Sequence, residues 1–401
     1  MKIIPLAPQD LPAIAGGRPI FAQRLPIVSP EGLPGEEFVR DIRKVIGSRQ
    51  LTNGSFVLEL ESMAVAYLGV PHCVAVSSCT SGLILTLRAL DLRGEVILPS
   101  FTFHATAHSV AWNGLKPVFA DCDPDSYCIS PASVRERLSP STAAIIGVHI
   151  FGNPANVNEL QEIASTARVP LVFDSAHAFG SKVNDTHVGG FGVAEVFSFS
   201  PTKLLVAGEG GLVATHDSDL AQRLRAARNY GDAGNSDPEL PGLNARMSEL
   251  HAALALRGLD GLEERIERRN EVRVLYEQRL RGIPGLSMQQ IACCNRSSCK
   301  DFQVLVDEVV FGRSRDWLFD ALQKENIEVR RYFSPPVHRQ KLYRDVWDKR
   351  PLPVTDRVSG SVVSLPIYSS LRDDDVVKVC DAIERAHEFA RRREVARGQS
   401  A

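Results

Sequence analysis

The chain has 401 residues, 44% of them hydrophobic and 23% charged, and a formal net charge of −2, a profile typical of a globular protein with one to three domains. The near-neutral charge gives no electrostatic reason to expect a nucleic acid or an anionic membrane as partner, and no apolar run approaches the roughly 18 residues of a membrane span. Because the N-terminus lacks the apolar core of a signal peptide, we expect a cytoplasmic protein.

The first 35 residues are rich in proline and glycine, which predicts an extended N-terminal segment. A helical pattern follows from about residue 39 to residue 68, and the turn-like sequence Leu51-Thr52-Asn53-Gly54 interrupts it. We therefore expect the large domain to begin near residue 36.

From residue 73 onward, short apolar runs alternate with helical patterns. Strands are expected over residues 73–76, 95–98, 117–120, 143–149, 171–174, 195–198 and 211–215. Helices are expected between them over residues 81–90, 105–112, 131–138 and 157–167. Because the strands are apolar throughout instead of alternating, they predict an α/β fold with a mostly parallel central sheet and helices on both faces.

The pattern changes after a long helical stretch over residues 248–281. Beyond Pro284 the sequence predicts a smaller α+β unit. Its expected elements are strands over 302–306 and 327–332 and helices over 315–325 and 373–392. We therefore divide the chain into an extended segment (residues 1–35), a large α/β domain (36–265) and a small C-terminal α+β domain (266–401).

The eight cysteines form neither a CxxC pair nor a zinc-binding spacing. We expect reduced thiols, as is usual in the cytosol, and no metal site. Cys293, Cys294 and Cys299 lie close together in the sequence, and we interpret their segment as a surface loop.

Polar side chains follow several expected strands at their carboxyl ends, where open α/β sheets bind ligands. Ser77–Gly82 offers hydroxyls and helix-start amides that suit a phosphate, although a plain helix cap uses the same residue types. Asp174 ends an apolar strand, where a carboxylate is costly unless it is paired. Lys203 lies between the strand 195–198 and the flexible Gly208–Gly211 turn, and taken alone it would be a surface lysine.

Considered together, these residues match the needs of pyridoxal 5′-phosphate. The lysine would form a Schiff base with the cofactor, and the carboxylate would keep the pyridine nitrogen protonated so that the ring acts as an electron sink. The hydroxyls and amides would hold the phosphate. Phe103 could stack on the ring, although core packing also explains an aromatic residue there. The combination is far more specific than any one of its members.

Several longer stretches occur in a fixed order between about Leu51 and Ile383. They read LTNG, VSSCTSGL, PSFTFHATA, DSAHAFG, SFSPTK followed by GEGG, RNYG, GLNARMSE and YFSPPVH. With these stretches the sequence resembles the DegT/DnrJ/EryC1/StrS aminotransferase family, which are sugar aminotransferases of the pyridoxal phosphate fold type I. One departure is Cys79, because the family usually has glycine before the threonine that corresponds to Thr80.

The resemblance implies roles for individual residues in the large, cofactor-binding domain. Lys203 would hold the cofactor and then move the proton as general base and acid. Asp174 would pair with the pyridine nitrogen, and His177 would lie near the 3-hydroxyl of the ring. Phe103 would cover the ring face.

The resemblance also implies which residues bind the phosphate and the substrate. Thr80, the Ser81 amide and Ser198 would hold the phosphate. Asn244 would reach the same phosphate from the other subunit, so that the protein would be a homodimer with shared active sites. Two further residues would lie near the substrate entrance, namely Tyr332 and His338.

The implied activity is a ping-pong aminotransfer. An amino donor, L-glutamate by family analogy, would leave its amine on the cofactor as pyridoxamine 5′-phosphate, and a keto-sugar linked to a nucleotide would take it up. Three alternatives remain: a keto-cyclitol or aminoshikimate-pathway acceptor, a sugar dehydratase of the same family, and a non-catalytic cofactor-binding regulator. The dehydratases replace the lysine by histidine, so the intact Ser200–Lys203 stretch argues against them. The sequence leaves the sugar, the aminated carbon and the pathway open.

Overall fold

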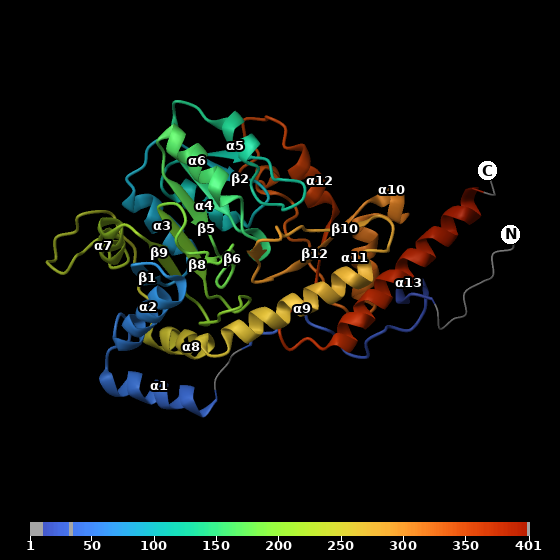
Figure 1. The fold of residues 1–401 in the computed structure, drawn as a ribbon, viewed down its shortest axis with the longest axis horizontal. Coiled ribbons are helices and arrows are strands. Elements are labelled where there is room, and N and C mark those ends of the chain that lie inside the picture. The colour runs from blue at the N-terminus through green and yellow to red at the C-terminus, as the bar shows by residue number, and fades with distance from the viewer. Residues whose placement is uncertain (1–10, 32–34, 399–401) are drawn as a thin grey trace.

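The computed structural model describes residues 11–31 and 35–398, and its centre is a seven-stranded sheet in the order β1-β9-β8-β5-β4-β2-β3 (Figure 1). The strands are β1 (His72–Val76), β2 (Glu95–Pro99), β3 (Lys116–Ala120), β4 (Thr142–Val148), β5 (Leu171–Asp174), β8 (Ala194–Ser198) and β9 (Gly211–Thr215). Four of the neighbouring pairs are parallel, which confirms the expected sheet. Strand β9 is antiparallel to β1 and β8 because it returns from β8 without a crossover helix.

Alternate residues of these strands face two different hydrophobic cores. In β1, Cys73 and Ala75 belong to one core, whereas Val74 and Val76 belong to the other. The helices that contribute to the first core include α2 (Ser55–Leu68), α6 (Val157–Ala167) and α8 (Glu249–Leu259). Three others contribute to the second core: α3 (Cys79–Ala89), α4 (His104–Trp112) and α7 (Ser218–Ala227). The sheet is thus buried on both faces, as its apolar strands predict.

The C-terminal part has its own core around a three-stranded antiparallel sheet in the order β10-β12-β13. Its elements are β10 (Leu286–Met288), β12 (Phe302–Val306), β13 (Val362–Leu365), α9 (Leu262–Leu280), α10 (Glu308–Phe311), α11 (Arg315–Lys324), α12 (Pro353–Ser361) and α13 (Asp373–Gly398). Figure 1 shows α9 running from the region of the large sheet to this unit. The boundary expected between residues 265 and 266 falls near the start of α9 and stays a prediction.

Short elements complete the described chain. They are α1 (Glu36–Ser48), α5 (Pro131–Arg137), η2 (Ala13–Ala15), η3 (Ile150–Gly152), η4 (Val337–Arg339), β6 (Lys182–Val183), β7 (Thr186–His187) and β11 (Asn295–Arg296). Strand β11 pairs with β6, which in turn pairs with β7. This small sheet brings the chain after residue 296 next to the carboxyl end of β5.

Two expectations about these elements need correction. The helical stretch 248–281 is divided into α8 and α9 at Gly261, whose φ of +65° is a left-handed conformation that glycine adopts at little cost. The strand expected over residues 327–332 is wrong. Isolated bridges join Ile327 to Leu25 and Arg330 to Ser364 instead, because the segment meets a different partner at each end.

The described part of the N-terminal segment packs against the C-terminal unit. Phe21 and Leu25 are buried in its core, and the Leu25 amide donates a hydrogen bond to the Asn326 carbonyl at 2.8 Å. The extended segment expected over residues 1–35 also includes residues 1–10 and 32–34, which lie outside the described residues.

The cysteines are all free thiols in the described residues. Cys293 and Cys294 are exposed, as a surface loop predicts, but Cys299 is buried, and its thiol lies 3.3 Å from Asn270 Oδ1. The surface-loop interpretation is therefore wrong for Cys299. Within the described ranges, no group of three or more His, Cys, Asp or Glu side chains is arranged to hold a metal ion.

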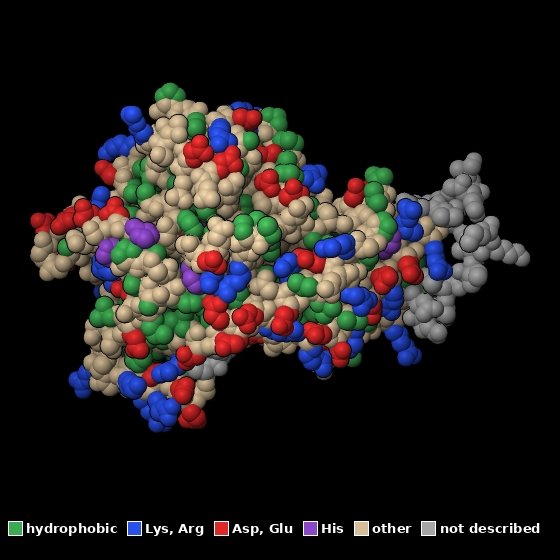
Figure 2. Space-filling view, viewed as in Figure 1, with side chains coloured by type: hydrophobic (Ala, Val, Ile, Leu, Met, Phe, Trp, Pro, Cys, Tyr) green, Lys and Arg blue, Asp and Glu red, His purple; other side chains and the backbone are tan. Residues whose placement is uncertain are grey.

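Acidic and basic side chains are interspersed over α9 and α13 on the face seen in Figure 2. Ion pairs join the two helices, such as Arg279 with Asp381 at 2.6 Å and Arg268 with Asp373 at 2.5 Å. This face therefore shows no extended patch of one sign. None of the helices in the described ranges combines the length and the apolar character that a membrane crossing requires.

The start of α2 is capped by a carboxylate that is distant in sequence. Glu249 is buried, and its carboxylate accepts hydrogen bonds from the amides of Gly54, Phe56 and Val57 at 2.8, 2.9 and 3.0 Å. The cap residue Gly54 has no side chain to do this itself.

We expect Glu249→Ala to lower the free energy of unfolding by about 2–4 kcal/mol, because it leaves three helix-start amides without their acceptor. Urea denaturation followed by circular dichroism measures this loss. The exposed Glu264→Ala is the matched control and should change the free energy of unfolding by less than about 0.5 kcal/mol. Equal stability of the Glu249→Ala variant and the wild type would show that water replaces the carboxylate.

Candidate active site

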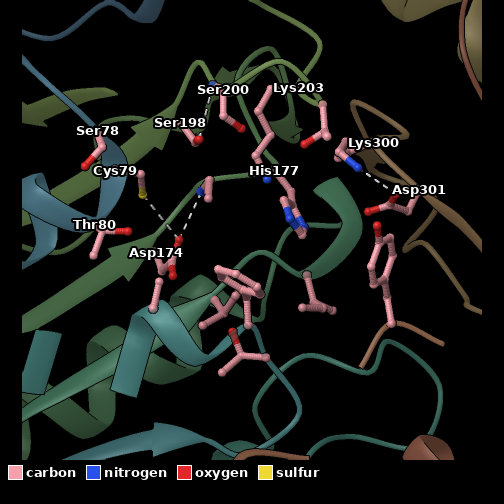
Figure 3. A pocket seen from close by; sticks show the side chains of 18 of the residues that line it. Ser78, Cys79, Thr80, Asp174, His177, Ser198, Ser200, Lys203, Lys300 and Asp301 are labelled. Carbon is pink, nitrogen blue, oxygen red and sulfur yellow. Dashed lines mark hydrogen bonds and ion pairs between the residues drawn. The ribbon is translucent and has the colours of Figure 1, made fainter. Parts of the chain in front are cut away.

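A cavity of about 390 Å³ lies at the carboxyl ends of the parallel strands (Figure 3). Residues at or just after several strands line this cavity, because the carboxyl ends of parallel strands lie at one edge of the sheet. The cavity is lined after β1 by Ser78, Cys79 and Thr80, after β2 by Thr102 and Phe103, at β4 by Val148 and Ile150, at β5 by Asp174 and His177, and at and after β8 by Ser198, Ser200, Thr202 and Lys203.

Asp174 forms the acidic end of the cavity. Its carboxylate accepts hydrogen bonds from Thr106 Oγ1 at 2.7 Å and from the Ala176 amide at 3.1 Å, and the Cys79 thiol lies 3.8 Å away. Burial raises the pKa of Asp174 despite these donors. Within the described residues no cation forms an ion pair with it, so its charge suits a cationic ligand group.

Lys203 approaches the same cavity from the loop between β8 and β9. Burial, together with the positive charge of Lys300, lowers the pKa of its amine to about 8. A larger fraction of this amine is therefore neutral near physiological pH than for an ordinary lysine. A neutral amine can act both as a nucleophile and as a base.

His177 lies beside Lys203 in the close-up (Figure 3). Its Nδ1 accepts a hydrogen bond from the Phe151 amide at 3.1 Å, so in the neutral ring Nε2 carries the proton. Burial, together with the charges of Lys203 and Lys300, holds the pKa of His177 well below its usual range. The imidazole is therefore a neutral hydrogen-bond donor.

A second part of the cavity, which adjoins Asp174 at Cys79, is rich in hydroxyl groups and contains the start of α3. Because α3 begins at Cys79, the amides of Cys79 and Thr80 have no acceptor within the helix. The strand β9 approaches this turn so closely that a Cβ on Gly211 would lie 2.6 Å from the Cys79 nitrogen. Such a concave start of a helix, lined by serine and threonine, suits a phosphate.

Only some of the residues that the sequence predicts to bind the phosphate line the cavity. Thr80 and Ser198 line the cavity. Ser81 is not among its lining residues, and the Ser81 amide donates to Ser78 Oγ at 3.0 Å in a capping box. Asn244 is exposed and lies outside the cavity of its own chain, where its Oδ1 accepts a hydrogen bond from Arg246.

The remaining expected residues occupy two different places. Phe103 and Tyr332 line the cavity. His338 does not, because it is fully buried behind the wall, where its Nδ1 lies 2.6 Å from Ser100 Oγ and its Nε2 lies 3.2 Å from Asp356 Oδ1. These contacts attach the turn after Pro336 to the end of β2.

Two residues of the cavity, Lys300 and Asp301, were not expected from the sequence. Lys300 is buried, forms an ion pair with Asp301 at 2.6 Å and lies 6.0 Å from the centre of the Tyr332 ring. Figure 3 shows this pair opposite the Asp174 side of the cavity. The pairing of β11 with β6 brings both residues to the cavity, and no local sequence motif predicts that pairing.

The donor set fits pyridoxal 5′-phosphate. A buried carboxylate without a cationic partner among the described residues suits a protonated ring nitrogen, and the free amides and hydroxyls at the start of α3 suit a phosphate. Lys203 lines the same cavity, and its lowered pKa suits a covalent attachment point. The cavity thus supplies one group for each functional end of the cofactor.

We expect the Lys203 amine in cofactor-free protein to lose its proton with a midpoint near pH 8, well below the ordinary value of 10.5. In Lys300→Met the midpoint should move to higher pH, because removal of a nearby like charge favours the protonated amine. The rate at which an amine reagent labels Lys203, followed by peptide mass at each pH, measures both midpoints. Lys341→Met changes an exposed lysine and should leave the midpoint in place. An unchanged midpoint in Lys300→Met would show that burial alone sets the value.

Comparison with known proteins agrees with this geometry. A model of the DegT/DnrJ/EryC1/StrS aminotransferase family matches residues 34–384. A dTDP-4-amino-4,6-dideoxy-D-glucose transaminase from Escherichia coli is 34% identical over 359 residues, which cover 88% of this chain and 96% of that protein.

Solved structures are similar over almost the whole chain. The structure of DesI in the presence of its TDP-sugar product has a TM-score of 0.90 and 37% identity, and the match covers 98% of this chain and 100% of that one. PseC from Helicobacter pylori, an aminotransferase involved in the biosynthesis of pseudoaminic acid, has a TM-score of 0.85 and 26% identity, with 92% and 100% covered. The fold class expected from the sequence is confirmed.

Proposed function

Because the chain belongs to the DegT/DnrJ/EryC1/StrS aminotransferase family of pyridoxal phosphate-dependent enzymes, we propose that it transfers an amino group from L-glutamate to a nucleotide-linked keto-sugar. The observation that carries the proposal is the pairing, in one cavity, of a lysine whose pKa is lowered to about 8 with a buried carboxylate that lacks a cationic partner among the described residues. The names of the relatives support a sugar as the amino acceptor.

The bound cofactor supplies an electron sink that stabilises negative charge at the carbon from which a proton is removed. Lys203 removes that proton through its neutral Nζ and returns it at the other end of the transfer, so that one residue serves as base and then as acid. Asp174 remains ionised beside the ring nitrogen and holds a proton on it. The lowered pKa of Lys203 suits this exchange near neutral pH.

The other residues of the site would bind and orient the cofactor. His177 would donate its Nε2 proton to the hydroxyl of the cofactor ring, since its Nδ1 is already engaged by the Phe151 amide. Thr80, Ser198 and the α3 amides bind the phosphate, and Phe103 covers the ring. The Ser81 amide helps indirectly, because its bond to Ser78 Oγ fixes the turn that carries the other donors.

The two residues expected near the substrate entrance have different roles. Tyr332 lies on it and can contact a sugar hydroxyl, whereas His338 supports the Pro336 turn from behind. Because nucleotide-linked sugars are made in the cytosol, we keep the cytoplasmic location as a prediction.

The proposal is tested by preparing the protein with pyridoxamine 5′-phosphate and adding candidate acceptors. We expect the absorbance of the pyridoxal form to return with the 4-keto counterpart of the sugar in the name of the Escherichia coli relative, or with a closely related nucleotide-linked keto-sugar. L-glutamate should then convert the cofactor back to the amine. A response to keto-cyclitols but to no keto-sugar would overturn the choice of acceptor.

We further expect a homodimer in which Asn244 binds the phosphate in the active site of the other subunit. Its exposure, away from the cavity of its own chain, supports this arrangement. Two inactive variants, Lys203→Ala and Asn244→Asp, test it, because the added carboxylate of the second would repel the phosphate.

A mixed dimer of these variants would have one site with both lesions and one intact site. Random mixing makes about half the dimers mixed, so activity should recover towards about a quarter of the wild-type value. Mixing Lys203→Ala with wild-type protein is the dilution control, because it should give about half of the wild-type activity whether or not the subunits exchange. No recovery after verified exchange would place both residues in the same site of one chain.

A further inference from the structure

A carboxylate outside the cavity lies at the centre of a fully buried hydrogen-bond network. Glu195 of β8 accepts hydrogen bonds through Oε1 from the amides of Gly189 and Phe191 at 2.7 and 2.8 Å. Its Oε2 accepts from Ser175 Oγ at 2.6 Å and from His149 Nε2 at 3.2 Å. The side chains of Glu195, Ser175 and His149 are each 0% exposed. Four donors thus satisfy one carboxylate that no water reaches.

The same three residue types make up a hydrolytic triad, but their arrangement here is different. His149 Nδ1 accepts a hydrogen bond from the Ala155 amide at 2.9 Å, so the neutral ring carries its proton on Nε2 and donates it to Glu195. The imidazole therefore has no nitrogen left to take a proton from Ser175, whose hydroxyl donates to the same carboxylate. The network holds segments of the chain together and performs no nucleophilic chemistry.

Ser175 connects this network to Asp174. Ser175 does not line the cavity, but the residues on either side of it, Asp174 and Ala176, both do. The Ser175 amide donates to the Val196 carbonyl at 2.9 Å, so its backbone and its side chain are both attached to β8. The Ala176 amide in turn donates to Asp174 Oδ1 at 3.1 Å. The position of Ser175 therefore fixes the backbone of Asp174 and one of the donors to its carboxylate.

His149 connects the network to the segment that orients His177. The His149 amide donates to the Asp174 carbonyl at 3.2 Å, and the His149 ring stacks on that of Phe173 at 4.7 Å. Two positions further along the chain, the Phe151 amide donates to His177 Nδ1 at 3.1 Å, the contact that determines the tautomer of His177. The carboxylate that holds Ser175 therefore also holds the start of this second segment.

Glu195 and Asp174 lie on opposite faces of the sheet. The neighbours of Glu195 in β8, Ala194 and Val196, belong to the second core, so the alternation of the strand turns Glu195 toward the first core. The Asp174 carboxylate instead accepts from the Thr106 hydroxyl of α4, a helix of the second core. The network therefore acts on Asp174 through the backbone that it holds.

From these contacts we infer that Glu195 is a positioning residue of the active site. Through Ser175 it holds the end of β5 that carries Asp174, and through His149 it holds the segment that orients His177. The inference rests on the proposed function, in which Asp174 and His177 contact the cofactor, and it adds a residue that the reaction needs although it touches neither cofactor nor substrate. Misplacement of such groups by about 1 Å can lower a rate by about 10²-fold.

Glu195→Gln tests the inference, because the carboxamide has nearly the same shape but turns an NH₂ group toward the donors Ser175 and His149. The rate constant with which saturating L-glutamate converts the bound cofactor to its amine form should fall by about ten- to hundredfold. The L-glutamate concentration that gives half the maximal rate should change by less than about twofold, since binding of the donor is not altered.

Two further measurements on Glu195→Gln do not depend on turnover. The visible circular dichroism of bound pyridoxal phosphate reports the orientation of its ring and should differ from that of the wild type. The Kd of pyridoxal phosphate, measured by adding it to cofactor-free protein, should rise by about threefold or more, because two of its contacts are displaced. A role in stability alone would move neither quantity in the folded protein.

Glu61→Gln is the matched control. Glu61 is also a buried carboxylate that holds a strand of the sheet, because it accepts from the Ala75 amide at 2.9 Å and pairs with Arg228 at 2.5 Å, and it lies outside the cavity. Its replacement should lower the melting temperature and leave the rate per folded molecule and the circular dichroism unchanged. Ser175→Ala, which removes one hydroxyl, is the second test variant and should lower the rate by about three- to tenfold with a change of the dichroism in the same direction.

A Glu195→Gln variant that melts earlier but keeps the wild-type rate and circular dichroism would overturn the inference, because the network would then contribute to stability alone. If that variant does not fold, the same result for Ser175→Ala overturns it. Failure of the proposed function gives a different pattern, in which the wild type binds pyridoxal phosphate but reacts with neither L-glutamate nor any other amino donor. The circular dichroism and the cofactor affinity of the variants would still decide the inference in that case.

Discussion

Lys203→Ala should lower the turnover of the amino transfer by at least about 10⁴-fold, because the change removes both the covalent attachment point and the group that moves the proton. The fold should persist, since the side chain projects into a cavity and makes no ion pair within the described residues. Single-turnover kinetics of each half-reaction, followed by cofactor absorbance, measures the loss. Both half-reactions should fall together, because one amine serves both.

Chemical trapping identifies the attachment point independently of turnover. Borohydride reduction of the holoenzyme followed by peptide mapping should tag Lys203. The mapping must separate it from Lys300, the second lysine in the cavity, and the exposed Lys341 serves as the background control. A tag on Lys300 or Lys341 instead of Lys203 would contradict the assignment.

The parts of the site that the sequence predicted are those that follow directly from strand order. Asp174 and Lys203 each come at or just after an apolar strand, and the carboxyl ends of parallel strands meet at one edge. The two residues could therefore be expected near each other without knowledge of the packing. The same reasoning gave the sheet itself, because apolar strands separated by amphipathic helices have few other arrangements.

The parts that the sequence did not predict depend on contacts between distant segments. The pairing of β11 with β6 brings Lys300 and Asp301 to the cavity. This pairing involves only two residues of each strand, and no sequence pattern predicts it. Glu249 caps α2 from 192 to 195 positions away. His338 matches a motif, yet its ring is turned to Ser100 and Asp356 and away from the cavity, an orientation that only side-chain packing decides.

Cys79 departs from the family motif, and the fold accommodates its side chain. The family usually has glycine here, but the Cys79 side chain is buried, and its thiol lies 3.5 Å from the Val196 carbonyl and 3.8 Å from Asp174 Oδ1. The side chain is thus accommodated between the start of α3 and the strands β5 and β8. Burial keeps the pKa of the thiol well above its usual range, so it is a neutral neighbour of the carboxylate.

Asp174→Asn should reduce turnover by about 10³-fold while the cofactor stays bound. A carboxamide has nearly the shape of the carboxylate, and Oδ1 can still accept from the Ala176 amide at 3.1 Å. The Thr106 hydroxyl, which now donates to Asp174 at 2.7 Å, can rotate to accept from the new amide because Thr102 Oγ1 lies 3.1 Å away on its other side. The fold is therefore retained. What is lost is the negative charge that holds a proton on the ring nitrogen, an electrostatic effect of the size seen when one preorganised group is removed.

Asp121→Asn provides the matched control for this prediction. Asp121 is also a buried carboxylate just beyond a strand of the same sheet, but it accepts from the amides of Val354 and Thr355 at the start of α12 and lies outside the cavity. This change should lower the melting temperature and leave turnover per folded molecule unchanged. Asp174→Asn should show the opposite pattern, with little effect on melting, since it removes an unpaired buried charge, and a large loss of turnover. Near-wild-type turnover of Asp174→Asn with the cofactor bound would mean that another group protonates the ring.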